Sequence, residues 1–486
     1  MTLEPTISEK QQQAQVPHGR RALLIGLLLA VSLHAFAELA IVTALPIISR
    51  DLDGALLYGV AFSSYLLTSI ISIVWSGHMT DEKGPVFPFV AGLIVFSIGL
   101  VLAAMAPTMW MFVFARGVQG LGGGAFSAVI MASVNRGWKD EERAHIMALL
   151  SSAWVIPGLV APVAAGAIAE FWNWRAIFVL LMPFVAVTLA LSLKGLRAMG
   201  PGQVHETATD KTIDAVRIAV GISMLIAAIT RMFDLWSVLL LVAGPVLVAR
   251  PLKRILPPGQ GLSRRILLAS LGIKFLLVFG FFGADTFLPL GLIEIHGLTA
   301  FVAGIVMTAA AVSWSAAAFA QSRLAARVSP RNLAVGGMAL IALSVSSLTL
   351  LLIEGVPYWW GFVFWAAGGA GTGLVYNTVI TSAMAHTMKG KEGATSIASG
   401  LAEGLSVALA AGLGGAILNQ VERQGEPLGL GIGIIWVICA LVVLAGGVVS
   451  FRYLERKVRV TVLDEPGSTG VGNPPQRSSL TDLSQD

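Results

Sequence analysis

The sequence predicts an all-α, polytopic membrane protein. It is 56% hydrophobic and only 12% charged, and its mean hydropathy is +0.81. A soluble protein of this size carries about twice that charge fraction. Apolar runs of about 18–25 residues recur along the chain, each about long enough to cross ~30 Å of hydrocarbon. The basic residues occupy short loops between these runs, so the pI near 9.4 does not indicate a nucleic-acid partner.

Fourteen membrane spans are expected. We place them at residues 22–48, 57–77, 86–106, 108–134, 144–169, 174–194, 213–230, 235–250, 266–292, 299–321, 332–353, 358–384, 395–418 and 430–451. The seventh and eighth are the shortest, and the seventh contains Arg217. No small-residue cleavage site follows the first apolar run, so we expect it to be a retained span and not a signal peptide.

The distribution of basic residues predicts the orientation. With the N-terminus inside, 25 of the 32 Lys and Arg residues fall in cytoplasmic segments, four in outer loops and three within spans. This asymmetry follows the positive-inside rule and requires an even number of spans. Both termini are therefore expected in the cytoplasm. The polar N-terminal tail (1–20) and the Pro/Gly/Ser-rich C-terminal tail (454–486) are expected to be disordered there.

A weak internal repeat relates the two halves of the chain. Leu-Pro pairs end at Pro46 and Pro289, and each is followed about 31–33 residues later by a polar stretch, 77–85 and 322–330. Two halves with related connections are typical of a transporter whose binding site lies between them.

The fourth span contains a buried cation beside glycines. Arg116 and Gln119 lie within residues 114–125, together with Gly120 and Gly124. An arginine at mid-bilayer costs roughly 2.5–3.5 kcal/mol on insertion scales, so it needs a partner or a water-filled cavity. The glycines allow another helix to approach closely.

These stretches resemble the major facilitator superfamily. Residues 116–122 are similar to its helix-4 signature R-x-x-Q-G-x-G, which implies a role for Arg116 in proton coupling. A structural arginine bonded to backbone carbonyls is the alternative. The loop between the second and third spans resembles the superfamily's cytoplasmic gate motif at three positions, namely Gly77, Asp81 and Gly84. Glu82 stands where the family usually has arginine, and Pro85-Val86 where it usually has Arg-Lys, so the motif departs from the family at these positions.

The fifth span resembles the antiporter signature of exporters in part. It carries two prolines and two glycines, Pro157, Gly158, Pro162 and Gly166. Alanines replace two glycines of the signature, at positions 161 and 165. Proline removes a backbone hydrogen bond and bends a helix, so a kinked packing helix is the alternative interpretation.

The first span resembles that of the fourteen-span drug:proton antiporters. An acid, Glu38, lies eight residues before the Leu-Pro proline, where the family more often has aspartate. Desolvation and a nearby Arg116 act on such a carboxylate in opposite directions, and their balance can place its titration near working pH. His34 lies one helical turn away and could share the proton. The alternatives are a static ion pair between Glu38 and Arg116, and a polar wall role for His34.

Two further acids lie well inside spans of the second half, Asp285 and Glu403. Each is a candidate second proton or cation site, or else a hydrogen-bonded structural residue. Lys274 lies eleven residues before Asp285, on nearly the same helix face, and a lysine near a span end can also snorkel to the interface.

Polar and large side chains of several spans are candidate walls of a substrate cavity, and ordinary packing is the alternative for each. They are Tyr65, Gln119, Trp154, Met307, Trp314, Tyr376 and Asn377. The single Cys439 permits neither a disulfide framework nor a CxxC metal site, and we expect no metal and no cofactor. The glycine run 368–373 lies in a span and indicates close helix packing, not a dinucleotide site.

The resemblance implies a fold of two six-helix bundles, 21–195 and 261–453, with two extra helices and linkers between them at 196–260. It implies proton-driven export of amphipathic or cationic small molecules by alternating access, in a bacterial plasma membrane, by a monomer whose partners are protons, substrate and the lipid bilayer. Uptake of a nutrient and export of a lipid or metabolite on the same fold are alternatives. A membrane-embedded receptor or enzyme is a further alternative, which the lack of a soluble domain or catalytic motif disfavours.

Overall fold

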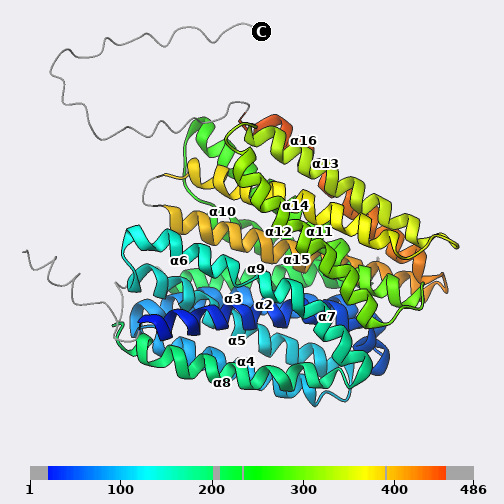
Figure 1. The fold of residues 1–486 in the computed structure, drawn as a ribbon, viewed down its shortest axis with the longest axis horizontal. Coiled ribbons are helices and arrows are strands. Elements are labelled where there is room, and N and C mark those ends of the chain that lie inside the picture. Colours follow the sequence, from blue (N-terminus) through cyan, green and yellow to red (C-terminus); the bar gives the residue numbers. More distant parts are fainter. Residues whose placement is uncertain (1–19, 201–207, 232–234, 389–390, 456–486) are drawn as a thin grey trace, which may run out of the picture.

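The computed structural model is a bundle of long helices, described for residues 20–200, 208–231, 235–388 and 391–455 (Figure 1). The predicted tails, 1–20 and 454–486, lie outside these residues except for Arg20, Leu454 and Glu455.

The first half of the chain forms seven helices and one short 3-10 turn. They are α2 (Arg20–Asp51), η1 (Ala55–Leu57), α3 (Tyr58–Lys83), α4 (Val86–Ala104), α5 (Met109–Gly137), α6 (Asp140–Ser152), α7 (Val155–Phe171) and α8 (Arg175–Arg197).

Two helices follow and then the second half. They are α9 (Ala208–Arg231), α10 (Leu235–Ile255), α11 (Gly261–Glu294), α12 (Ala300–Leu324), α13 (Pro330–Leu348), η2 (Thr349–Leu352), α14 (Trp360–Ala385), α15 (Glu392–Arg423) and α16 (Leu428–Tyr453).

A helix lies at each of the fourteen predicted spans. Among the described residues, twelve helices are long and apolar enough to cross a membrane; α10 and α14 are not among them. α14 is rich in Gly and Thr and carries Asn377, which lowers its hydropathy although much of it is buried. The prediction of an all-helical membrane protein is confirmed, and the count of fourteen crossings stays a prediction.

The fifth predicted span, 144–169, differs from the expectation of one kinked helix. It consists of two helices, α6 and α7, which break at Ala153–Trp154. Pro157 lies in the first turn of α7, where a missing N–H is tolerated. The carbonyl four residues before it, that of Ala153, instead accepts a hydrogen bond from Ser32 Oγ of α2 (3.0 Å). The carbonyl that the break leaves without a helical partner therefore gains a hydrogen bond from a neighbouring helix.

The two halves repeat one packing pattern and meet along a seam. In the first half α5 packs against α3 and α4, and in the second half α14 packs in the same way against α12 and α13. Across the seam, α7 packs on α12 and α3 packs on α15. The helices of the second half lie beside those of the first half, with their axes running in the same general direction (Figure 1).

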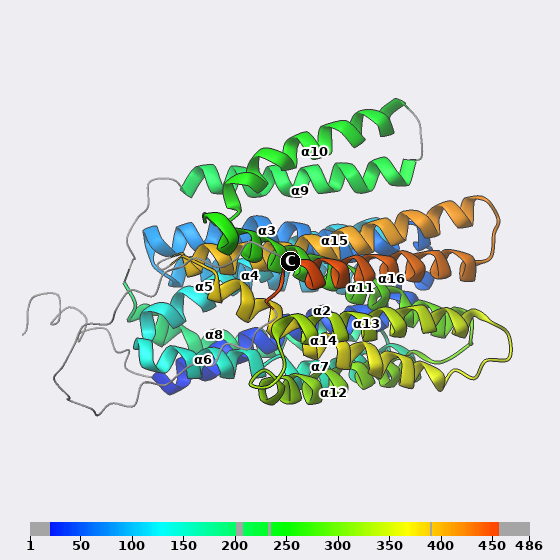
Figure 2. The ribbon, with the colours of Figure 1, turned by 90° about the horizontal axis from the view of Figure 1, so that it is seen from above.

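The pair α9–α10 lies on one side of the bundle, outside both halves (Figure 2). α9 contacts α3 of the first half and α15 of the second, so it covers one edge of the seam. Its Ile226 lies against Gly412 of α15, where an added Cβ would come within 2.5 Å of the isoleucine.

The hydrogen bonds that join described residues of the two halves gather toward the end where α2 ends and α3 begins, which we call the closed end. Arg50 pairs with Glu294 (2.6 Å), and the Tyr58 hydroxyl donates to the Thr286 carbonyl (3.0 Å). The backbone N–H of Ala300 donates to a Glu170 carboxylate oxygen (3.2 Å). At the opposite end, ion pairs such as those of Asp81 and His386 stay within one half.

Candidate transport site

Arg116 lies two turns after the start of α5 at Met109 and is 1% exposed. Its guanidinium donates a hydrogen bond to Gln119 Oε1 one turn away, and it lies over the ring of Tyr65 from α3, 4.3 Å from the ring centroid. The Tyr65 hydroxyl shares a 2.7 Å hydrogen bond with His34 Nδ1. The other ring nitrogen of His34 lies 3.8 Å from Glu38 Oε1. We call these five residues, His34, Glu38, Tyr65, Arg116 and Gln119, the arginine cluster.

The direct ion pair considered for Arg116 and Glu38 is not formed. No nitrogen of the guanidinium lies within 4 Å of that carboxylate, although both residues are described. The Tyr65 ring covers the arginine. The tyrosine hydroxyl is bonded to His34, and His34 in turn lies near the carboxylate of Glu38. Electrostatic interaction between the two charges persists over the longer distance. A cation under an aromatic face and beside an amide oxygen has two favourable contacts without a carboxylate.

Glycine permits this arrangement on α5. A Cβ at Gly123 would lie 2.5 Å from the Tyr65 hydroxyl and 3.2 Å from His34 Nδ1. A Cβ at Gly120 would lie 2.1 Å from the Tyr65 carbonyl. The glycine face that the sequence indicated therefore brings α3 close enough for its tyrosine to reach both Arg116 and His34.

A second cluster lies in the other half. Lys274 Nζ of α11 is 2.8 Å from Glu403 Oε2 of α15, and it donates to Ser399 Oγ at 2.9 Å. The Tyr376 hydroxyl of α14 donates to the same Glu403 oxygen (2.9 Å), and Lys274 lies 4.9 Å from the centroid of that tyrosine ring. We call Lys274, Tyr376, Ser399 and Glu403 the lysine cluster. Snorkelling of Lys274 is thus excluded in this structure, because its side chain is 5% exposed and bound inside the bundle.

The two clusters lie in different halves of the molecule, and their acids, Glu38 and Glu403, interact electrostatically across the seam. Both side chains keep partial access to open space, 20% for Glu38 and 36% for Glu403, whereas Lys274 beside them is buried. Each half therefore contributes one partly open acid, and each acid has a buried cation nearby.

Asp285 does not join either cluster. It lies on α11, roughly 16 Å along the helix from Lys274 at 1.5 Å per residue, and toward the closed end. It is 8% exposed and lies close to the Trp365 indole. The hydrogen bond of Tyr58 to the adjacent Thr286 carbonyl places Asp285 beside the seam contact.

The predicted wall residues separate into exposed and buried groups. Trp154 is 39% exposed and contacts the His34 ring edge-on, with centroids 6.0 Å apart. Trp314 and Tyr376 contact each other (5.5 Å) and are partly exposed. The remaining four are placed differently: Tyr65, Gln119 and Met307 are buried, and Asn377 is exposed. Tyr65 and Gln119 therefore bind Arg116 and do not form walls here, because α3 and α5 pack too closely.

The fifth-span signature lies at the seam. A Cβ at Gly166 would lie 2.3 Å from the Ala300 carbonyl of α12, and one at Gly304 of α12 would lie 2.3 Å from the Pro162 carbonyl. Gly158 is less crowded, since its Cβ would meet Ala311 at 3.6 Å. The small residues thus let α7 and α12 touch through their backbones.

The predicted gate loop is mostly helical. α3 continues to Lys83, and Gly84, with φ of 82°, makes the turn. Asp81 lies in the last turn of α3 and pairs with Arg136 from the end of α5. Arg136 also donates to the Thr80 carbonyl (3.2 Å). The sequence indicated Asp81 as part of a gate motif but did not identify Arg136 as its partner.

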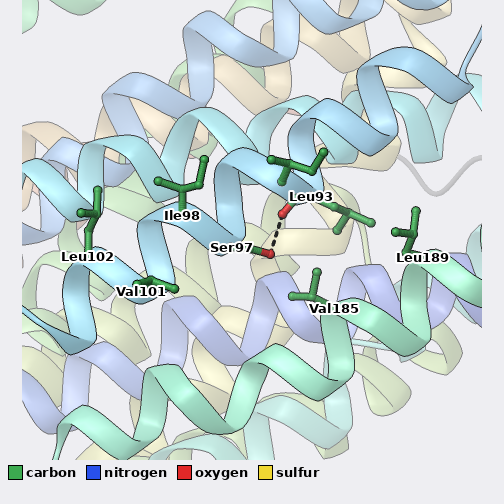
Figure 3. Close-up of a pocket in the computed structure, with 8 residues that line it drawn as sticks. Leu93, Ser97, Ile98, Val101, Leu102, Val185 and Leu189 are labelled. Atoms are coloured by element: carbon green, nitrogen blue, oxygen red, sulfur yellow. Dashed lines mark hydrogen bonds between the residues drawn. The ribbon is translucent and has the colours of Figure 1, made fainter.

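A groove on the outer face of the first half lies apart from both clusters (Figure 3). It has a volume of about 350 Å³ and is lined by α4 and α8 residues, namely Leu93, Ile94, Ser97, Ile98, Val101, Leu102, Val185 and Leu189. The Ser97 hydroxyl is satisfied by the Leu93 carbonyl (2.8 Å), so the lining presents apolar atoms. Among the described residues no group of three His, Cys, Asp or Glu side chains could hold a metal ion.

Comparison with known proteins decides the family. The model of the Major Facilitator Superfamily matches residues 27–411, which is most of the chain. The chain belongs to this superfamily. Its members are transporters, and the motifs at Arg116 and Asp81 are now placed on α5 and α3 of a major facilitator fold.

Relatives within the superfamily include two named for multidrug transport. The chain is 26% identical over 391 residues to the multidrug transporter protein MdtP of Bacillus subtilis, covering 77% of this chain and 71% of that one. It is 23% identical over 351 residues to the multidrug efflux pump SdrM of Staphylococcus aureus, covering 71% and 78%.

Solved major facilitator structures share the fold. A transporter of the POT family in complex with 5-aminolevulinic acid superposes with a TM-score of 0.69 at 16% identity, covering 90% of this chain and 98% of that one. At that identity the likeness shows the architecture alone. It includes almost the whole helical bundle of this chain.

Proposed function

We propose that this protein is a proton-coupled antiporter that exports amphipathic, cationic small molecules by alternating access. It would reside in a bacterial plasma membrane as a monomer with fourteen spans and both termini in the cytoplasm. The observation that carries the proposal is a matched pair of acids, Glu38 in the first half and Glu403 in the second, each partly open and each near a buried cation. The names of the bacterial relatives, a multidrug transporter and a multidrug efflux pump, support export of drug-like small molecules.

The geometry suits exchange of a proton for a cation. An ionised Glu38 can attract an organic cation, and Trp154, which contacts His34 one turn away and is 39% exposed, adds an aromatic surface for cation–π contact. A proton arriving from the other side neutralises the same carboxylate and removes that attraction. Substrate and proton then compete for one group, which is the requirement for exchange by a two-state carrier.

His34 and Tyr65 serve this exchange by position. The hydrogen bond between them fixes the imidazole so that its second nitrogen points toward Glu38. Arg116 lies behind the Tyr65 ring, within electrostatic reach of Glu38 but outside contact distance. In this proposal Arg116 stabilises the ionised form of Glu38 while no cation is bound.

The closed end supports an inward-facing conformation. If the basic-rich loops face the cytoplasm, the contacts of Arg50, Tyr58 and Glu170 with the second half lie on the outer side. The site would then be sealed from outside and reached from the cytoplasm or the inner leaflet, as an exporter requires when it collects substrate.

Flux measurements test this function. Purified protein in proteoliposomes, with tetraphenylphosphonium as substrate and an imposed pH gradient, should move the cation against its own gradient toward the acidic side. Reversing the pH gradient should reverse the movement. Cation movement with the proton, toward the alkaline side, would indicate uptake by symport, and no flux under any gradient would refute transport of this class.

A further inference from the structure

The lysine cluster contains a permanent cation bound to one of the two acids of the site. Lys274 contacts Glu403 at 2.8 Å and Ser399 at 2.9 Å, and the Tyr376 hydroxyl holds the same Glu403 oxygen. Lys274 is 5% exposed, while Glu403 keeps 36% of its side chain open. The lysine thus binds the carboxylate from inside the second half, and the rest of the carboxylate side chain stays partly open.

The formal charges around the site can be counted. Glu38 and Glu403 each contribute −1, and Arg116 and Lys274 each contribute +1, so the four groups sum to zero when the acids are ionised. A neutral His34 adds nothing. One bound proton brings the site to +1, and one bound monovalent cation brings it to the same +1. A doubly charged cation would bring it to +2.

An extra uncompensated charge is costly in a partly desolvated site. Surrounding water and counter-ions screen such a charge poorly between packed helices, and the attraction of one carboxylate does not offset the desolvation of two cationic centres. The site therefore distinguishes substrates by charge as well as by size.

We propose that Lys274 is a specificity-determining residue that limits this transporter to monovalent cations. Its ammonium group pairs with the carboxylate of Glu403 as a tethered cation. The carboxylate of Glu38 is then the one that is available to substrate. This inference rests on the proposed function, since it names the charge class of the substrate that the same site accepts.

Substitution of Lys274 tests the inference. Lys274→Gln removes the tethered charge and lowers the sum at the site to −1, so a divalent cation would then bring it only to +1. We expect the flux ratio of dequalinium (two charges) to tetraphenylphosphonium (one charge) to rise at least fivefold over wild type. Lys274→Arg, the matched control, keeps the charge and should keep the wild-type ratio. An unchanged ratio in Lys274→Gln, with protein in the membrane, overturns the inference.

Binding measurements on purified protein separate this inference from the proposed function and do not depend on Lys274→Gln folding well. Glu403→Gln leaves Lys274 without its partner and should weaken tetraphenylphosphonium binding at least tenfold. Lys274→Gln combined with Glu403→Gln restores the zero sum and should bring the affinity back to within threefold of wild type. Failure of the double variant to recover binding contradicts the charge argument. If wild-type protein shows no pH-driven flux but the variants bind tetraphenylphosphonium as predicted, proton coupling is refuted. The charge specificity of the site is still supported in that case.

Discussion

Tyr65 connects the charged residues of the first half. Its ring lies over Arg116 and its hydroxyl is bonded to His34. One buried side chain therefore links the arginine with the histidine that lies one helical turn from Glu38. The ring and the hydroxyl have separable tasks. The ring partly compensates a buried cation, and the hydroxyl orients an imidazole.

Tyr65→Phe should therefore reduce pH-driven flux about two- to tenfold, because one hydrogen bond is worth roughly 0.5–1.5 kcal/mol. The protein should still reach the membrane, since the ring over Arg116 remains. Tyr65→Leu removes both contacts and should be more severe in flux and in thermal stability. Wild-type flux and an unaltered pH profile in Tyr65→Phe would show that the hydroxyl does not orient His34 for function.

At this scale the sequence showed which charged residues lie inside the helices but not which residues they contact. Glu38, His34 and Arg116 were recognisable because charged groups are rare inside apolar runs. Their contacts depend on how α3 approaches α5, which Gly120 and Gly123 allow but which no periodicity specifies. Lys274 was noted on the face of Asp285, whereas its partner is Glu403, 129 positions later and on another helix.

Helix α7 shows what a single element contributes. It begins after a break whose free carbonyl is satisfied by Ser32, and its small residues Pro162 and Gly166 meet the backbone of α12. Proline and glycine signalled an irregular helix in the sequence. The site of the break was not predictable, because it depends on a hydrogen-bond donor from α2.

Gly166→Leu should open the closed end, because even a Cβ at this position would lie 2.3 Å from the Ala300 carbonyl. Spin labels at the exposed residues Leu56 and Leu430, one in each half near that end, should report a larger population of long distances. The native Cys439 is 2% exposed and should remain unlabelled. Gly158→Ala on the same helix is the control. Equal distance distributions for Gly166→Leu and wild type would mean that this contact does not set the closure.

The whole molecule combines two repeated bundles with an added helix pair. α9 touches α3 and α15, so the added pair covers one edge of the seam that must open and close. Composition and span length were enough to predict the helical bundle, and the spacing after the Leu-Pro pairs at Pro46 and Pro289 indicated the repeat. The position of α9 across the seam was not predictable, since apolar helices facing lipid and helices facing protein have similar composition.

The number of crossings is testable by reporter fusions. Fusions after residue 232, between α9 and α10, should give active alkaline phosphatase and dark green fluorescent protein, because that point is expected outside. Fusions after residue 258 should show the reverse. The same reporter behaviour at both points would mean that α9 and α10 do not both cross, and the chain would then have fewer than fourteen spans.

The central claim is that Glu38 couples protons to substrate, and the most direct test is Glu38→Gln assayed in two ways in the same proteoliposomes. A glutamine keeps the size of the side chain but cannot carry the exchanged proton. We predict that pH-driven tetraphenylphosphonium transport falls at least twentyfold. Exchange of labelled for unlabelled cation needs no proton and should fall less than threefold at saturating cation, although half-maximal exchange should require more cation because the attraction of the carboxylate is lost. Undiminished pH-driven transport in Glu38→Gln would contradict the account and move the coupling role to Asp285 or Glu403.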